Sequence, residues 1–213
     1  MPSRDLDATE FVRVSDVVPG AIEEIRYFTT YNFTGHRVAG YEQPCALLTG
    51  PAAMALARAA EALERRGLRV RVYDAYRPQR AVNDFIAWAQ DLDDVRMKGV
   101  FYPDVEKAEL FERDYIAARS SHSRGSTVDL TLFDDRSGAN LDMGSPFDFF
   151  GDVSHSDFAQ LGARQLANRR LLREVMESAG FVGIPSEWWH FTLVDEPFPT
   201  TYFDFPVRAD AVR

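Results

Sequence analysis

Two short stretches decide how this chain is interpreted: Ser121-His122-Ser123-Arg124-Gly125-Ser126-Thr127-Val128-Asp129 and Glu187-Trp188-Trp189-His190. They contain three residues that commonly bind zinc, namely His122, Asp129 and His190. Three protein ligands leave one position of a tetrahedral zinc ion open, as in catalytic rather than structural zinc sites. The remaining carboxylate, Glu187, is of the right type to accept a proton from a metal-bound water. If these residues converge in space, the sequence predicts a zinc hydrolase.

The first stretch leads into a predicted strand over residues 127–133, where apolar and polar residues alternate. The alternation places Asp129 on the face opposite Val128. Taken alone, an acidic residue in this position most often faces solvent. However, His122 lies one loop earlier, and Gly125 lets the chain turn back. The two side chains can therefore reach one point in space.

The second stretch sets a geometric condition on the site. Glu187 precedes His190 by three residues, and residues at that spacing lie on opposite sides of a regular strand. Both can face one metal ion only if the chain bends before Trp188, which Pro185 favours. Taken alone, His190 among aromatic residues is more typical of a hydrogen-bonded structural histidine.

Outward from these stretches, the sequence predicts a mixture of strands and helices. The clearest helix covers residues 51–66, because Pro51 suits a first turn and Gly67 suits a C-terminal cap. Ser156 is the expected N-cap of the longest helix. The other expected elements are strands over 23–29, 68–73 and 188–194, helices over 78–90 and 157–179, a short helix from Val105, and a loop over 138–150. The predicted fold class is α+β, with a mostly antiparallel central sheet flanked by helices.

Length and composition limit the function classes. The 213 residues fit a single domain over residues 1–213, with residues 1–20 as a loose or edge segment at its periphery. The net charge of −9 argues against nucleic acid as a partner. The single cysteine, Cys45, excludes an intrachain disulfide and zinc binding by several cysteines. The N-terminus lacks a signal peptide, and no stretch has the ~20 apolar residues that span a membrane, so we expect a cytoplasmic protein without a membrane partner.

Several segments carry a family resemblance that covers nearly the whole chain in order. They are Asn32-Phe33-Thr34-Gly35, Asp74-Ala75-Tyr76-Arg77-Pro78, residues 120–132, Met143-Gly144-Ser145-Pro146-Phe147-Asp148, Glu187-Trp188-Trp189-His190 and Tyr202-Phe203-Asp204-Phe205-Pro206-Val207. At these residues the chain resembles the VanX-type D-alanyl-D-alanine dipeptidases. These belong to a wider group of zinc D,D-peptidases that share a fold with hedgehog signalling domains.

The resemblance implies how the chemistry is divided among the residues. It implies one zinc ion per chain, bound by His122, Asp129 and His190. Glu187 would activate the metal-bound water as a general base and then act as a general acid. Arg77 would face the scissile carbonyl, where a guanidinium beside zinc stabilises the oxyanion. Without the resemblance, a surface salt bridge is an equally good interpretation of Arg77.

The resemblance also implies the substrate, which is the small dipeptide D-alanyl-D-alanine, hydrolysed to two D-alanines. Asp148 matches the carboxylate that holds the substrate's amino terminus, although a loop aspartate alone would more often cap a turn. Ser120, Tyr27 and Tyr41 match other pocket positions. Equally, the two tyrosines are compatible with a core position and the serine with a turn.

Two other functions stay open at this point. One is a peptidase of wider specificity, which cleaves other dipeptides or trims muropeptide stems as a D,D- or L,D-peptidase. The other is a zinc-binding module without activity, which an intact Glu187 and Arg77 argue against. The resemblance leaves open the oligomeric state. It also leaves open whether the role is glycopeptide resistance, dipeptide recycling or precursor control.

Overall fold

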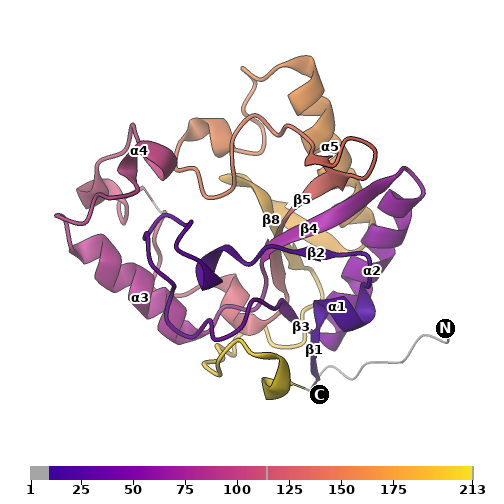
Figure 1. Ribbon diagram of the computed structural model, residues 1–213, viewed down its shortest axis with the longest axis horizontal. Helices are drawn as coiled ribbons and strands as arrows, with labels where there is room; N and C mark the ends of the chain where they lie inside the picture. Colours follow the sequence, from indigo (N-terminus) through magenta and orange to yellow (C-terminus); the bar gives the residue numbers. More distant parts are fainter. Residues whose placement is uncertain (1–9, 114, 213) are drawn as a thin grey trace.

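A six-stranded sheet forms the centre of the computed structural model, which describes residues 10–113 and 115–212 (Figure 1). Its strands are β2 (Ile22–Glu23), β4 (Leu68–Asp74), β5 (Thr127–Asp134), β6 (Ala139–Asn140), β7 (Phe181–Ile184) and β8 (Glu187–Leu193). Five of them follow the order β2-β4-β5-β8-β7, and β6 pairs with β5. Only β2 and β4 are parallel, and the other pairs are antiparallel. The predicted α+β class with a mostly antiparallel sheet is confirmed.

Two long helices pack against this sheet and against each other. They are α2 (Gly50–Glu64), which contacts β4, and α5 (Ala163–Ser178), which contacts β7. Five apolar residues of β4 and β5 are fully buried, namely Val70, Val72, Val128, Leu130 and Leu132. The helix α3 (Gln79–Gln90) follows the end of β4 and lies away from this pair (Figure 1). The short helices are α1 (Val14–Val17) and α4 (Lys98–Phe101).

The N-terminal segment is better ordered than the sequence predicted. A two-stranded antiparallel sheet joins β1 (Phe11–Arg13) to β3 (Leu47–Thr49). Its neighbours Val14 and Val18 are buried in the core with Phe11 and Val12. Of the two expectations for residues 1–20, a loose segment is therefore wrong for residues 11–18, because their apolar side chains pack inward, whereas an edge segment agrees with β1. Residues 1–9 lie outside the described part of the chain.

Most predicted elements agree with the structure, and the longest helix is the main exception. The helix α5 begins at Ala163 rather than at residue 157. Ser156 does not cap it, because the Ser156 hydroxyl donates a hydrogen bond to the Ile184 carbonyl at 2.8 Å. Instead, Gln165 accepts a hydrogen bond from the Gly162 backbone at 3.0 Å. Residues 157–162 are therefore a loop that precedes α5.

The strand expected over residues 23–29 is also shorter. Only Ile22–Glu23 is a strand, and Arg26–Phe28 forms the 3-10 helix η1. The side-chain amide of Asn32 donates to the carbonyls of Thr29 and His36, at 2.7 and 2.8 Å, and so holds the following turn. Downstream, the helix expected from Val105 is the 3-10 helix η2 (Lys107–Glu109), and the loop expected over 138–150 contains β6. No described helix is both long and apolar enough to cross a membrane.

Candidate metal centre and active site

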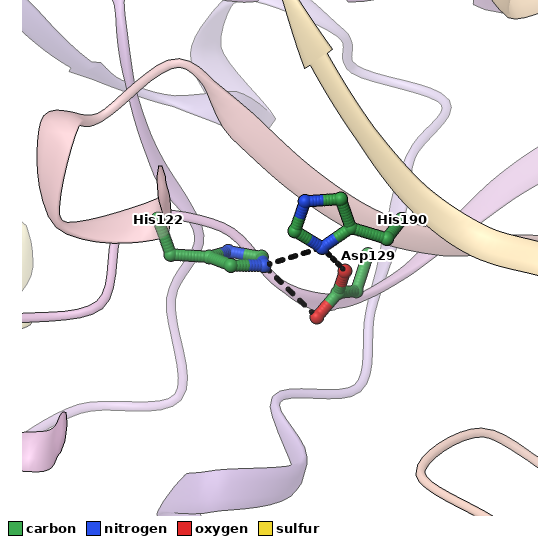
Figure 2. A group of neighbouring side chains, drawn as sticks. All are labelled: His122, Asp129 and His190. Atoms are coloured by element: carbon green, nitrogen blue, oxygen red, sulfur yellow. Dashed lines mark hydrogen bonds and ion pairs between the residues drawn. The ribbon is translucent and has the colours of Figure 1, made fainter. Parts of the chain in front are cut away.

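Three predicted metal ligands meet at one buried point, as Figure 2 shows. The Nε2 atom of His122 lies 3.2 Å from Nδ1 of His190 and 3.2 Å from Oδ2 of Asp129. The Nδ1 atom of His190 lies 3.2 Å from Oδ1 of Asp129. All three side chains are buried. The convergence expected from the sequence is therefore present in the structure.

The sheet register explains why two of these residues meet. Asp129 on β5 is the direct cross-strand partner of His190 on β8, so both side chains leave the same face of the sheet. The third residue, His122, lies on the 3-10 helix η3 (Ser121–Arg124), which Gly125 ends at φ +82°. A side chain at Gly125 would overlap the ring of Phe11, so this tight turn also requires glycine for space.

The protonation pattern fits a bound cation. Nδ1 of His122 lies 2.7 Å from the Ala75 carbonyl, which can only accept, so the lone pair of His122 is on Nε2. Nε2 of His190 lies 3.2 Å from the Ser121 hydroxyl, which leaves Nδ1 facing His122. Such outer contacts typically orient histidine ligands. Among the described residues, Oδ1 of Asp129 is a buried oxygen that lacks a hydrogen-bond donor. Two imidazoles and a carboxylate form a donor set that suits zinc.

Electrostatics keep the carboxylate of this cluster ionised. Burial alone would raise the pKa of Asp129, but the adjacent His122 and His190 lower the pKa below its usual value. Metal ligands of this kind must be deprotonated, so the site provides the required anionic oxygen at neutral pH.

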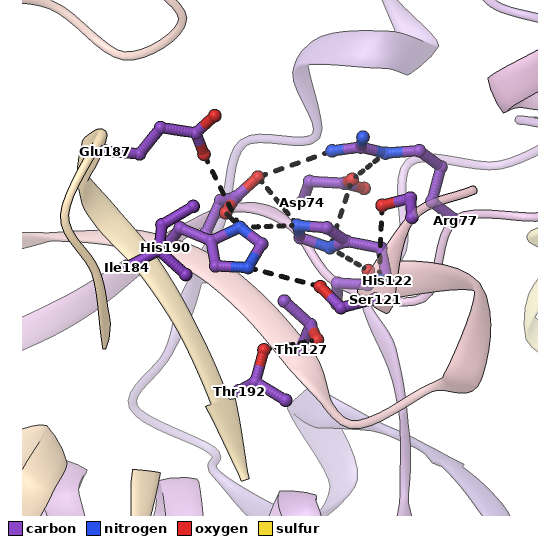
Figure 3. Close-up of polar contacts among 12 residues, drawn as sticks. Asp74, Arg77, Ser121, His122, Thr127, Ile184, Glu187, His190 and Thr192 are labelled. Carbon is purple, nitrogen blue, oxygen red and sulfur yellow. Dashed lines mark hydrogen bonds and ion pairs between the residues drawn. The ribbon is translucent and has the colours of Figure 1, made fainter. Parts of the chain in front are cut away.

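Glu187 meets the geometric condition that the sequence set. It is the first residue of β8, directly after the hairpin turn, and pairs with Ile184 where the β7–β8 register is irregular. The irregularity lets Oε2 of Glu187 approach to 3.5 Å from Nδ1 of His190 (Figure 3). The Glu187 side chain keeps 32% of its exposure, which leaves it open to the cavity described below. Burial raises the pKa of Glu187, and the nearby negative charge of Asp129 adds to this effect, which the positive charge of His190 opposes.

Arg77 lies on the corner between β4 and α3, directly before Pro78. Its Nε donates to Oδ2 of Asp74 at 2.8 Å, and its Nη2 lies 3.5 Å from Oδ2 of Asp129. The guanidinium also lies over two aromatic rings, 5.0 Å from the centre of Tyr27 and 5.2 Å from that of Phe85. These contacts fix a positive charge at the edge of the metal-ligand cluster.

Asp74 belongs to the site, although the sequence did not predict a role for it. It is buried, accepts a hydrogen bond from the Tyr41 hydroxyl at 2.6 Å, and holds Arg77 (Figure 3). A β-bulge between Val72 and Asp74 makes Asp74 the partner of Asp129. Without that extra residue, strand alternation would put Asp74 on the face of Val72. A signal was available, because Asp74 opens the segment that resembles the dipeptidases.

The remaining predicted substrate residues divide into two groups. Tyr27 donates a hydrogen bond from its hydroxyl to Oδ2 of Asp148 at 2.8 Å, and both line the same cavity as Ser120. Tyr41 does not line this cavity, and its hydroxyl donates a hydrogen bond to the buried Asp74 instead. Burial raises the pKa of Asp148 well above its usual value, and the nearby negative charge of Asp129 raises it further.

One cavity of about 270 Å³ joins these groups. The three metal-ligand candidates, the Glu187 and Asp148 carboxylates and the Arg77 guanidinium all line it, together with apolar side chains such as Phe85 and Phe150. Polar groups of opposite charge around a small apolar-walled space are typical of a site for a small molecule. The arrangement suits a substrate with a positive end near Asp148 and a reacting carbonyl near Arg77.

Comparison with known proteins agrees with this geometry. The peptidase M15 family model, described as D-ala-D-ala dipeptidase, matches residues 7–208. A D-alanyl-D-alanine dipeptidase of Streptomyces coelicolor (strain ATCC BAA-471 / A3(2) / M145) is 44% identical over 93% of this chain and 98% of its own length. Proteins of the same name from Enterococcus faecalis (strain ATCC 700802 / V583) and Enterococcus faecium are 42% and 40% identical, over 92% and 93% of this chain and 98% of each relative. The chain therefore belongs to the D-Ala-D-Ala dipeptidase family of M15 peptidases.

Proposed function

We propose that this protein hydrolyses D-alanyl-D-alanine to two D-alanines with one zinc ion per chain. The observation that carries the proposal is the placement of Glu187, Arg77 and Asp148 around one small cavity beside the metal-ligand cluster. The names of the relatives support the choice of substrate. His122, Asp129 and His190 would hold the zinc ion. When bound, zinc supplies Lewis acidity, which makes water a stronger acid and polarises a carbonyl.

Glu187 carries the protons in the proposed reaction. Its carboxylate, next to His190, accepts a proton from the attacking water and later gives a proton to the leaving amine. The raised pKa of Glu187 suits both steps, because a base works best when its pKa approaches the operating pH. One carboxylate can thus serve both halves of the reaction.

Arg77 stabilises the negative charge that develops on the carbonyl oxygen. Its guanidinium is already oriented by Asp74 and by the Tyr27 and Phe85 rings, so little reorganisation accompanies the reaction. The second nitrogen of the fork, Nη2, is directed toward Asp129 and the cluster. A fixed cation at this position acts mainly in the transition state, where the charge is largest.

Asp148 binds the free amino terminus of the substrate in the proposed reaction. A buried carboxylate attracts an ammonium group strongly, and the Tyr27 hydroxyl fixes the orientation of Oδ2. Ser120, on the wall next to His122, is placed to contact the rest of the dipeptide. The proposed partner is therefore a free dipeptide. We place the reaction in the cytoplasm, where this dipeptide is made for cell-wall precursors.

The test compares two substrates and two variants of the zinc-loaded protein. D-Alanyl-D-alanine should be cleaved much faster than its N-acetylated form, because acetylation removes the ammonium group. Glu187→Gln should lower kcat by about 10²- to 10⁴-fold, the usual contribution of a general base, with zinc content unchanged. Glu177→Gln, on the exposed side of α5, is the matched control and should keep full activity. Equal rates on both substrates, or full turnover by Glu187→Gln, would refute the proposal.

A further inference from the structure

Arg169 on α5 is a buried cation that lies outside the site described so far. Its side chain donates to the backbone carbonyls of Met143, Val153 and His155, at 2.6, 2.7 and 2.7 Å. It also lies 3.5 Å from the Ser145 hydroxyl. Among the described residues, no carboxylate forms an ion pair with Arg169, although burying a cation is costly without compensation. Its hydrogen bonds therefore all serve one segment, the loop of residues 143–155.

This loop carries Asp148 in an unusual backbone conformation. At φ +61°, Asp148 is the only described residue other than glycine in the left-handed region. Such a conformation persists only where the surroundings fix it. Arg169 binds the loop on both sides of Asp148, at Met143 and Ser145 before it and at Val153 and His155 after it. The position of the Asp148 carboxylate thus depends on α5.

The same contacts connect the loop to the strand that carries the proposed base. Nε1 of Trp188 donates to the Ser145 hydroxyl at 2.9 Å, and Trp188 directly follows Glu187 on β8. The Ser145 hydroxyl also lies 3.0 Å from the Ser154 hydroxyl, within the loop. The guanidinium of Arg169 lies 5.8 Å from the Trp188 ring centre. Ser145 is therefore the junction between the loop of Asp148 and the strand of Glu187.

We propose that Arg169 and Ser145 are positioning residues that fix the separation between Asp148 and Glu187, and so set the length of substrate that the site accepts. The inference rests on the proposed function, in which Asp148 holds the amino group and Glu187 acts at the scissile bond. In an α-dipeptide, a single carbon atom separates the amino group from the scissile carbonyl. A β-amino dipeptide has one more carbon there, and a tripeptide has a whole residue more. A fixed separation accepts the first and excludes the others.

The experiment measures kcat/KM for D-alanyl-D-alanine and for β-alanyl-D-alanine with zinc-loaded protein. Wild type should prefer the α-dipeptide by more than about tenfold, as for other sites that reject an extra methylene group. Arg169→Met should reduce this preference by about tenfold, and Ser145→Ala by about threefold, because each loosens the loop. Arg170→Met is the matched control, since it removes an exposed arginine one position along α5. It should keep the wild-type preference.

A uniform loss would overturn the inference. If Arg169→Met and Ser145→Ala lower both kcat/KM values by the same factor, the network only stabilises the fold. Ser145→Ala keeps the test available if Arg169→Met does not fold, because it removes a single hydroxyl. Arg169→Lys, which keeps the charge but not the fork geometry, should lie between wild type and Arg169→Met. If wild type cleaves neither substrate, the proposed function itself fails. Cleavage of D-alanyl-D-alanine with unchanged preference in the variants refutes only this inference.

Discussion

The metal-ligand cluster and the loop of residues 143–155 face one cavity, yet they are held in different ways. Two of the three predicted ligands, Asp129 and His190, are fixed by main-chain pairing between central strands. Asp148 lies on a loop outside the sheet, and the Arg169 side chain binds three backbone carbonyls of that loop. Register in a sheet is cooperative, whereas side-chain contacts can change one at a time. The groups that would perform the chemistry are thus built into the fold, and those that would choose the substrate are adjustable.

The largest effect is expected on the sheet side of this comparison. His190→Ala should abolish stable zinc binding and lower kcat/KM by about 10³-fold or more, because the Lewis acid contributes several kcal/mol. Metal content and kinetics on the same preparation provide the measurement. Thr192→Val is the control, since Thr192 lies two residues further on the same strand and its hydroxyl bonds the Thr127 hydroxyl on the neighbouring strand. Retention of one zinc ion per chain by His190→Ala would show that the ligand set is different.

A smaller effect is expected on the loop side. Asp148→Asn should lower kcat/KM by about 10²-fold, mainly through KM, because the substrate's ammonium group loses its charged partner. Asparagine tolerates the positive φ of this position, so the loop should keep its conformation. Zinc content should not change. A loss confined to kcat would place Asp148 in the chemistry instead of in recognition.

The same variant should be more stable than wild type at high pH. Burial raises the pKa of Asp148 above its ordinary 3.8, so the folded protein binds the Asp148 proton more tightly than the unfolded protein does. Wild type therefore loses stability as pH rises from 3.8 through the raised pKa, and the asparagine variant does not. At pH 8 the variant should melt about 2–4 °C higher, and the difference should shrink as pH falls. The measurement compares the melting temperatures of metal-free wild type and Asp148→Asn at pH 5 and pH 8. A difference in melting temperature that grows toward low pH would contradict the raised pKa of Asp148.

The smallest effect tests a contact beside the metal-ligand cluster. Tyr41→Phe removes the hydrogen bond to Asp74, which orients Arg77. We expect a loss of about 1–2 kcal/mol in stability and a three- to tenfold lower kcat, with KM unchanged. Tyr73→Phe is the control, because its hydroxyl accepts from Asn140 away from the cavity. An effect of Tyr41→Phe on KM alone would instead indicate that Tyr41 contacts the substrate.

The sequence predicted the components of the site better than their connections. Strand alternation alone indicated the face of Asp129. The spacing of Glu187 and His190 required an irregular chain, and the β7–β8 register is irregular between these two residues. The pairing of Asp129 with His190 joins segments far apart in the chain, so no local pattern could reveal it. The bulge that brings Asp74 to the site depends on one extra residue in β4, and alternation predicts the opposite face.

The errors in the fold have a similar cause. Serine is a common helix cap, but the Ser156 hydroxyl donates to the carbonyls of Ile184 and Glu187 in the β7–β8 hairpin. Residues 23–29 alternate like a strand, but the Asn32 side chain provides the hydrogen bonds that favour a turn. The Ser156 hydroxyl thus bonds a tertiary partner, whereas the Asn32 amide bonds carbonyls only three and four residues away. The role of Arg169 was hidden for the same reason as that of Ser156, since its partners are carbonyls of a distant loop.

The contact between Phe11 and Gly125 has a practical consequence for anyone who trims or tags this protein. Phe11 belongs to the first described strand, yet its ring fills the space beneath the turn that ends the His122 segment. It also packs against the rings of Tyr76, Phe203 and Phe205. A truncation that removes Phe11 would open a hole under a predicted metal ligand, His122, more than a hundred residues away. Expression variants should therefore keep the chain intact from Glu10 onward. A lower zinc content would indicate that a truncation had removed Phe11 or residues after it.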